Sequence, residues 1–224
     1  MLFDYDKAPS PMKNESVKVY YEMLREKRDA LRVKRGIDIL VSLLMIVMLM
    51  PLLILIAITV KLDSKGPVLF KQERITRGMK KFRILKFRTM VDGAAMLGPA
   101  VTLKDDKRIT KVGSFLRKTR IDELPQLFNV LIGDMSFVGT RPEVEKYVNH
   151  YSEDMMATLL LPAGITSMAS IEFRNEAERL KNAENSDRVY IEEILPAKMV
   201  LNLEYLRDFS LKLDFRILFK TITK

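Results

Sequence analysis

Hydrophobic and polar positions divide the chain into three parts. Residues 39–60 contain no charged side chain, and basic residues stand on both sides of this run. Before it, apolar residues recur at helical spacings, which predicts an amphipathic helix. After it, charged and apolar segments alternate as in one folded domain. We therefore expect an N-terminal helical extension (1–33), a membrane segment (34–62) and a larger domain (63–224).

The apolar run is long enough to cross a bilayer. A helix over residues 39–60 is about 33 Å long, against about 30 Å for a hydrocarbon core. Pro51 lies near its middle and removes a backbone hydrogen bond, which predicts a kink or a break. Basic flanks favour the cytoplasmic side of a membrane. A re-entrant helix broken at Pro51 keeps both flanks inside, so we prefer it, with a single-pass anchor as the alternative.

The helix before the apolar run has two interpretations. Its stripe consists of Val17, Tyr20, Tyr21, Leu24 and Leu31, with basic residues opposite. Such a helix is suited to the surface of an anionic phospholipid membrane. It is nearly as well suited to packing on the core of the protein itself.

The larger domain mixes helices with a short sheet. Residues 68–75 and 82–90 are rich in strand-forming side chains around a short turn, which predicts a β-hairpin. Helices are expected around residues 114–119, from Asp122 to Gly133, over 172–182 and in the apolar C-terminal segment, with a turn at 162–166. The fold class predicted is therefore α+β and mainly helical, with a re-entrant anchor and amphipathic interfacial helices.

Composition limits the chemistry. The net charge is +9 and the pI is about 9.6, which points to anionic partners without choosing among them. The chain has no cysteine and a single histidine, so it has no disulfides, cysteine nucleophile or histidine-clustered metal site.

Two adjacent acids, Asp122 and Glu123, lie between arginine-rich segments where a helix is expected to begin. They have two explanations. One is structural, with Asp122 capping the helix and Glu123 in its first turn. In the other, backbone amides, Arg117 and Arg120 keep the carboxylates ionised and also hold phosphate oxygens.

Further basic residues are candidates for phosphate contacts. Lys86 and Arg88 share one face of the second predicted strand, so they are expected to point at the same phosphate. Arg141 lies in a rigid turn between Gly139 and Pro142. Arg174 is a candidate for substrate contact within the charged segment that follows.

From Lys34 onward, the chain resembles the monotopic polyprenol-phosphate phosphoglycosyl transferases, the bacterial sugar transferase family. The motifs that carry the resemblance are KRGID, GPVLFKQERI, KFRTM, DELPQLFNVLIGDMSFVGTRPE, PAGIT and EYLRDFSLKLDFRI. Residues 1–33 lie outside it. The resemblance implies an enzyme on the cytoplasmic face of the bacterial inner membrane. It would move a sugar 1-phosphate from a UDP-sugar to undecaprenyl (polyprenyl) phosphate and release UMP.

The resemblance also assigns roles to residues. Asp122 corresponds to the nucleophile of a ping-pong reaction and Glu123 to its partner acid, with a magnesium ion (Mg2+) held near both. Arg117 and Arg141 correspond to phosphate-binding arginines, and Lys86 and Arg88 match the basic pair of the KFRTM strand. Many members have an aspartate where this chain has Asn202, which could contact substrate but could not act as a base.

Two other classes of function compete with this one. One is a membrane-anchored basic module that binds anionic lipid or nucleic acid, but the absence of tryptophan and the clustering of arginines at the acidic pair argue against nucleic acid. The other is a nucleotide-sugar hydrolase that uses the same aspartate. The sugar and the glycan pathway are not defined by the sequence, and a homodimer is compatible with it.

Overall fold

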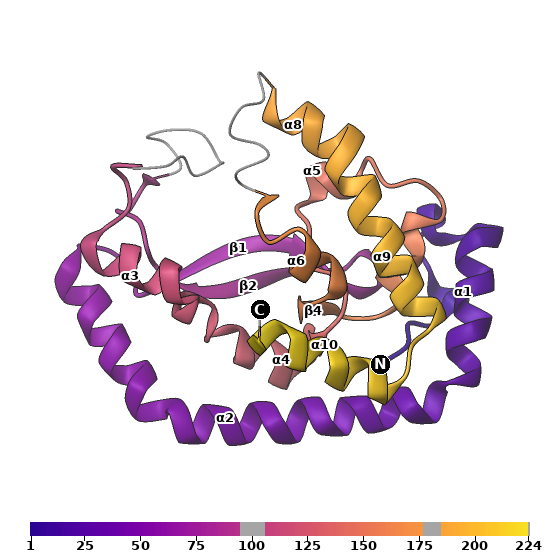
Figure 1. The fold of residues 1–224 in the computed structure, drawn as a ribbon, viewed down its shortest axis with the longest axis horizontal. Helices are drawn as coiled ribbons and strands as arrows, with labels where there is room; N and C mark the ends of the chain where they lie inside the picture. Colours follow the sequence, from indigo (N-terminus) through magenta and orange to yellow (C-terminus); the bar gives the residue numbers. More distant parts are fainter. Residues whose placement is uncertain (95–105, 177–184, 224) are drawn as a thin grey trace.

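The structure is a computed structural model that describes residues 1–94, 106–176 and 185–223. One long helix, α2, runs along the lower edge of the molecule in Figure 1 and packs against α3, α4 and β3. The helices are α1 (Glu15–Glu26), α2 (Arg28–Asp63), α3 (Lys111–Thr119), α4 (Gln126–Ile132), α5 (Glu145–Val148), α6 (Met168–Glu172), α8 (Ser186–Val189), α9 (Leu195–Arg207) and α10 (Leu211–Thr223). The predicted class, α+β and mainly helical, agrees with this element content.

Shorter helical turns join these elements. Those of 3-10 type within the described ranges are η1 (Tyr5–Lys7), η2 (Ser10–Met12), η3 (Arg77–Met79), η5 (Ile121–Glu123) and η6 (Met155–Leu160). A further helical turn, η7 (Tyr190–Ile194), is a π-helix directly before α9. Residues 177–182 of the expected charged helix lie outside the described residues.

Helix α2 is unbroken, with Pro51 inside it. The expectation of two helices separated by a break at Pro51 is therefore wrong for the backbone. Figure 1 shows instead that α2 bends in its second half towards α3. A proline can be accommodated in this way because it removes one backbone hydrogen bond and bends the helix, while the apolar flanks contain no other helix breaker. The expected boundary between residues 33 and 34 also falls inside α2.

One face of α2 packs on the rest of the protein in two stretches. Its buried residues recur every three or four positions within each stretch: Leu31, Lys34, Asp38, Ser42 and Ile46 in the first, and Leu53, Ile56 and Val60 in the second. The opposite face exposes large apolar side chains, including Leu40, Leu43, Leu44, Val47, Met48, Ile54, Leu55 and Ile58. An exposed apolar surface of this extent is typical of a membrane or protein contact.

Polar contacts fix both ends of α2. Near its start, Arg35 donates to the carbonyl oxygens of Val130 (2.6 Å) and Leu131 (2.8 Å) at the end of α4. At its last residue, a carboxylate oxygen of Asp63 accepts a hydrogen bond of 3.1 Å from the amide of Val112 in α3. The helix is therefore a fixed part of the folded domain, not a separate anchor on a linker.

The N-terminal helix packs on the core of the protein. Val17 and Leu24 of α1 are fully buried, and the backbone amide of Phe3 donates to the carbonyl of Leu160. The side-chain amide of Asn14 donates to the carbonyl of Glu153. Of the two interpretations of this stripe, the structure supports packing within the protein.

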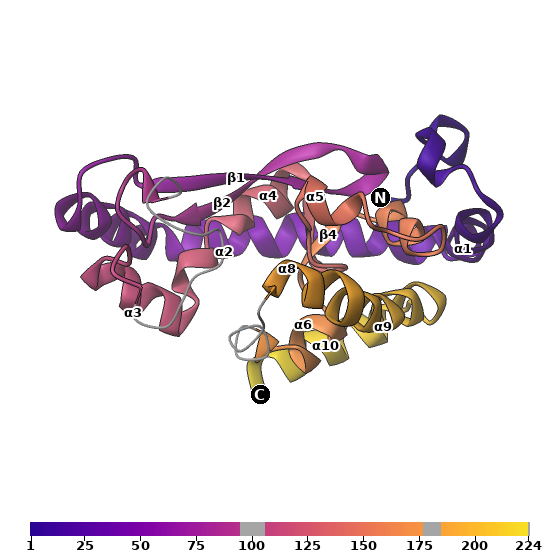
Figure 2. The same cartoon turned by 90° about the horizontal axis from the view of Figure 1, so that it is seen from above.

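The predicted hairpin is present. Strands β1 (Leu69–Ile75) and β2 (Lys81–Phe87) pair antiparallel. A second sheet was not expected: β3 (Met135–Val138) pairs in parallel with β4 (Ala163–Thr166), so the turn predicted at residues 162–166 is wrong. Figure 2 shows the hairpin on one side of α2 and the helices α6, α9 and α10 on the other.

Two glycines bring the β3 and β4 strands unusually close. A side-chain carbon on Gly164 would lie 2.2 Å from backbone atoms of Gly139, and one on Gly139 would lie 2.8 Å from the carbonyl of Pro162. The amide of Gly139 donates to Thr166, and that of Gly164 donates to Thr140. This close approach fixes the start of the turn that carries Arg141.

Candidate active site

The acidic pair lies in a 3-10 turn between α3 and α4. Helix α3 ends at Thr119, and Arg120 follows in the left-handed conformation with φ of 56°. Asp122 and Glu123 are in the next turn, η5, and α4 begins after Pro125. Neither η5 nor α4 has a side-chain cap at its N-terminus. The helix-cap explanation of the pair therefore does not hold.

Glu123 is instead the meeting point of two cations. Its Oε1 accepts hydrogen bonds from Nζ of Lys86 at 2.7 Å and from Nη2 of Arg141 at 3.3 Å. Burial acts to raise the pKa of this carboxyl, but Arg141 and Lys86 more than offset it and lower the pKa to about 2. Glu123 is thus a permanent anion that organises the basic side chains around it.

Asp122 has the opposite electrostatic character. Burial and the negative charge of Glu123 raise its pKa above the ordinary value, while Lys86 and Arg117 act to lower it. Arg117 lies in the last turn of α3, one turn before the pair. Adjacent carboxyl groups whose pKa values are pushed apart are a common sign of different chemical roles.

Lys86 is held between charges of both signs. Burial lowers its pKa, as does Arg141, whereas Glu123 and Asp122 act to raise it. The lysine comes from β2 and the arginine from the turn after β3. Segments far apart in the sequence therefore converge on Glu123.

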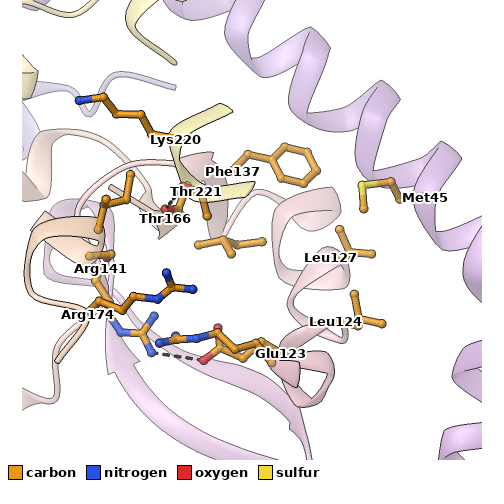
Figure 3. Close-up of a pocket in the computed structure, with 14 residues that line it drawn as sticks. Met45, Glu123, Leu124, Leu127, Phe137, Arg141, Thr166, Arg174, Lys220 and Thr221 are labelled. Carbon is orange, nitrogen blue, oxygen red and sulfur yellow. Dashed lines mark hydrogen bonds and ion pairs between the residues drawn. The ribbon is translucent and has the colours of Figure 1, made fainter. Parts of the chain in front are cut away.

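A pocket of about 320 Å³ opens beside Glu123. Its charged residues are Arg120, Glu123, Arg141, Arg174 and Lys220, and its large apolar residues include Met45, Leu124, Leu127, Phe137, Ile165 and Ile171. Figure 3 shows Arg141 and Arg174 beside Glu123 at one end, with Leu124, Leu127 and Met45 along the other wall. Met45 belongs to α2, so the apolar wall reaches the long apolar helix.

The structure brings Arg174 into the site, as the sequence suggested. It also adds Lys220 and Thr221 of α10, Phe137 of β3 and Met45, which were not expected. No local motif marks these positions, because each is brought to the pocket by packing between distant elements. Asp122 is not among the residues that line this pocket but directly precedes one that does.

Arg88 does not join Lys86 at the acidic pair. Its Nη2 donates to the carbonyl oxygen of Ser64 at 2.7 Å and to the hydroxyl of Ser64 at 2.9 Å. Arg88 is buried just beyond the end of α2, where backbone carbonyl groups lack helical partners. This corrects the expectation of a joint phosphate site: the strand ends at Phe87, and Arg88 turns to the helix terminus.

Asn202 is also placed away from the pocket. It is buried in α9, and its side-chain amide contacts the sulfur of Met199 at 3.6 Å. It is not among the residues that line the pocket. The expectation of a substrate contact there is not supported, because the side chain faces the core between helices.

The chain offers few ligands for a metal ion. Within the residues that the structure describes, no group of three or more His, Cys, Asp or Glu side chains comes together. The acidic pair fits the usual mode of magnesium, in which one or two carboxylates share the ion with substrate phosphates.

Comparison with known proteins identifies the family of this chain. Residues 29–224 match the family model described as bacterial sugar transferase. The chain therefore belongs to the bacterial sugar transferase family.

Curated relatives are similar over most of this chain. The UDP-N-acetylgalactosamine-undecaprenyl-phosphate N-acetylgalactosaminephosphotransferase of Aeromonas hydrophila is 38% identical over 85% of this chain and 43% of its own length. The UDP-glucose:undecaprenyl-phosphate glucose-1-phosphate transferase of Escherichia coli is 36% identical over 85% of this chain and 39% of its own. The exopolysaccharide production protein PSS of Rhizobium leguminosarum bv. phaseoli is 37% identical over 84% of this chain and 92% of its own length. The chain thus spans less than half of the first two relatives.

Proposed function

We propose that this protein transfers a sugar 1-phosphate from a UDP-sugar to undecaprenyl phosphate and releases UMP. The observation that carries the proposal is the contact of Lys86 and Arg141 with Glu123, next to Asp122 and at the mouth of a pocket with one cationic and one apolar end. Cationic groups suit the diphosphate of the donor. The apolar wall suits the lipid chain of the acceptor.

Asp122 is the proposed nucleophile. An oxygen of its carboxylate attacks the sugar-linked phosphorus, the bond from that phosphorus to the bridging oxygen breaks, and UMP leaves with that oxygen. The result is an acyl phosphate that joins the sugar phosphate to Asp122. A phosphate oxygen of undecaprenyl phosphate then attacks the same phosphorus, which frees the Asp122 carboxylate and completes the lipid-linked product.

The basic residues have separate tasks in this scheme. Arg141 and Arg174 line the pocket and would hold phosphate oxygens with their planar donor forks. Lys86 and Arg117 lower the pKa of Asp122, which favours the anion that must attack. Glu123 keeps Lys86 and Arg141 in place through its charge.

Asp122 and Glu123 are the residues that would hold a magnesium ion in this proposal. When bound, the ion would neutralise charge on the diphosphate oxygens as UMP leaves.

We also propose that both ends of α2 lie on one side of the membrane, as in a monotopic protein of the bacterial inner membrane with its catalytic face in the cytoplasm. The supporting observation is that the folded domain contacts the helix at Arg35 and again at Asp63. A straight crossing would put a bilayer of about 30 Å between those contacts. The bend and the exposed apolar face suit a helix that dips into the membrane and returns.

The test is a single-turnover reaction with UDP-glucose and UDP-N-acetylgalactosamine, labelled in the β-phosphate, with magnesium and without acceptor. We expect UMP in proportion to enzyme and a phosphosugar adduct on Asp122 by mass analysis. Asp122→Asn should form neither, whereas the surface variant Asp208→Asn should behave as the wild type. Full transfer by Asp122→Asn would refute the mechanism. Release of free sugar phosphate even with undecaprenyl phosphate present would indicate a hydrolase instead.

A further inference from the structure

Lys198 is a buried cation outside the pocket that joins two segments of the site. It lies in α9, and its side chain is 6% exposed. Its Nζ lies 3.0 Å from Oε2 of Glu176 and 3.4 Å from Oε1 of Glu143. It also donates to the hydroxyl of Tyr190 at 2.9 Å. A buried ammonium group is costly unless it is paired in this way.

Each of the two carboxylates stands two residues after an arginine of the pocket. Glu143 follows Arg141, and Glu176 follows Arg174. Both arginines line the pocket beside Glu123, where Figure 3 shows their guanidinium groups close together. One lysine therefore ties together the two chain segments that present these guanidinium groups.

The Glu143 end of this link is held from several sides. Tyr190, in the π-helix η7, donates its hydroxyl hydrogen to Oε1 of Glu143. From β1, Arg74 donates to the carbonyl of Pro142 at 3.2 Å and lies 3.9 Å from Oε2 of Glu143. π-helical turns are rare and are often found at functional sites. Here the turn directs a tyrosine at the residue that follows the Arg141–Pro142 step.

The charges also compete for Arg141. Burial acts to lower the pKa of Arg141, but Glu123, Glu143 and Glu176 outweigh it and raise the pKa. Glu143 and Glu176 therefore act on the charge of Arg141 in addition to Glu123. The positive charge of Lys198 satisfies both of these carboxylates and leaves Arg141 available to Glu123 and to a phosphate.

We propose that Lys198 is a positioning residue that sets the spacing of Arg141 and Arg174 for a diphosphate, through Glu143 and Glu176. This inference rests on the proposed function for the identity of the substrate. Lys198 itself contacts no substrate in this scheme, because it is buried behind both arginines.

The test compares Lys198→Met with Lys34→Met. Lys34 is an equally buried lysine, 5% exposed and paired with Asp214 at 2.6 Å, but it is not part of the pocket. The first readout is the affinity for inorganic pyrophosphate by calorimetry, and the second is the KM for the UDP-sugar in UMP release. We expect Lys198→Met to weaken both about tenfold with a smaller change in kcat. Lys34→Met should lose comparable thermal stability but keep both values.

Two further variants separate positioning from general damage. Lys198→Arg keeps the charge and should recover most of the pyrophosphate affinity. In an Arg174→Met background, Lys198→Met should weaken pyrophosphate binding much less than in the wild type. One of the two arginines through which Lys198 acts is then already absent. If Lys198→Met does not fold, Tyr190→Phe and Lys198→Arg are compared with the wild type instead. Tyr190→Phe should then weaken pyrophosphate affinity and raise the KM slightly.

The outcomes for the two proposals are distinct. Unchanged pyrophosphate affinity and KM in Lys198→Met, with normal UMP release, would overturn the positioning role and leave the transferase proposal standing. Weakened pyrophosphate binding in Lys198→Met, with no UMP from either UDP-sugar even in the wild type, would leave the positioning role standing and remove the proposed transfer of these two sugars. Equal effects in the wild-type and Arg174→Met backgrounds would also overturn the positioning role.

Discussion

Asp122 and Glu123 are neighbours in the chain, yet their carboxyl groups have pKa values shifted in opposite directions. Lys86 and Arg141 contact Glu123 and lower its pKa to about 2, whereas burial and Glu123 itself raise the pKa of Asp122. The pair is thus divided into an anion that organises the site and a carboxylate whose ionisation depends on its surroundings.

The first prediction concerns the pH dependence of UMP release. Attack needs the Asp122 anion, so activity should be present above the pKa of Asp122 and lost as the pH falls through it. Because that pKa is raised above 3.8, the acid limb should lie above the ordinary aspartate range. Glu123→Gln removes a charge that raises this pKa, so the limb should move to lower pH even if the rate falls. The acid limb is measured by single-turnover UMP formation across a range of pH. A shift of this limb to higher pH in Glu123→Gln would contradict the assignment of Asp122 as the nucleophile.

The second prediction concerns stability in acid. A carboxyl group whose pKa falls from 4.5 to about 2 on folding stabilises the protein above pH 4.5. That contribution is lost as the pH falls from 4.5 towards 2. Urea unfolding should therefore show wild type and Glu123→Gln differing at pH 7 and converging in this window. A difference that stays constant would show that Glu123 is not held by its two cations.

The third prediction concerns the contact between Gly139 and Gly164. A methyl group on Gly164 would lie 2.2 Å from backbone atoms of Gly139, so Gly164→Ala should lower the free energy of unfolding by about 1–3 kcal/mol. It should also raise the donor KM, because Arg141 follows Gly139 by two residues. Gly36→Ala is the matched control. It has open space and lies inside α2, so its stability should stay equal or rise by up to about 1 kcal/mol.

The fourth prediction separates Arg88 from the phosphate-binding residues. Arg88→Met should lower the thermal midpoint, because the carbonyl of Ser64 loses its donor. It should leave the donor KM near the wild-type value. Arg141→Met should instead raise the donor KM strongly, because a phosphate contact is lost. Thermal unfolding and initial rates on the same preparations decide between them, and a raised KM in a stable Arg88→Met protein would restore Arg88 to the site.

The fifth prediction concerns topology. The chain has no cysteine, so single cysteines can be placed at Glu26, Lys71 and Met48. Positions 26 and 71 flank α2 and should react with a membrane-impermeant thiol reagent only from the cytoplasmic side. Met48 is 69% exposed on the apolar face and should react only after detergent is added. Labelling of positions 26 and 71 from opposite sides would show a single span.

Local patterns predicted much of the fold, and the reasons are specific. The hairpin of β1 and β2 has strand-forming residues on both sides of a turn at Gly78, and α4 ends at Gly133 in the left-handed conformation. Such signals depend on neighbouring residues alone. The pairing of β3 with β4 does not, because both are short strands that meet only through packing in three dimensions.

The site divides in the same way. Glu123, Lys86, Arg141 and Arg174 were expected, and the structure brings them together. Arg88 was misplaced because its guanidinium group donates to Ser64 just beyond the end of α2, a partner that strand alternation does not reveal. Lys220 could not be foreseen, since its place depends on how α10 packs against α6 and β4.

The two fixed ends of α2 have a consequence for the proposed position at the membrane. A domain on a flexible tether can tilt and rise above a bilayer, whereas here contacts at Arg35 and Asp63 join α2 to the domain that carries the pocket. The depth of the acidic pair below or above the lipid head groups is then set when the chain folds. A lipid acceptor would then diffuse laterally to a phosphate-binding site at a constant depth in the bilayer. The rate of transfer to the lipid acceptor should therefore depend on the thickness of the bilayer.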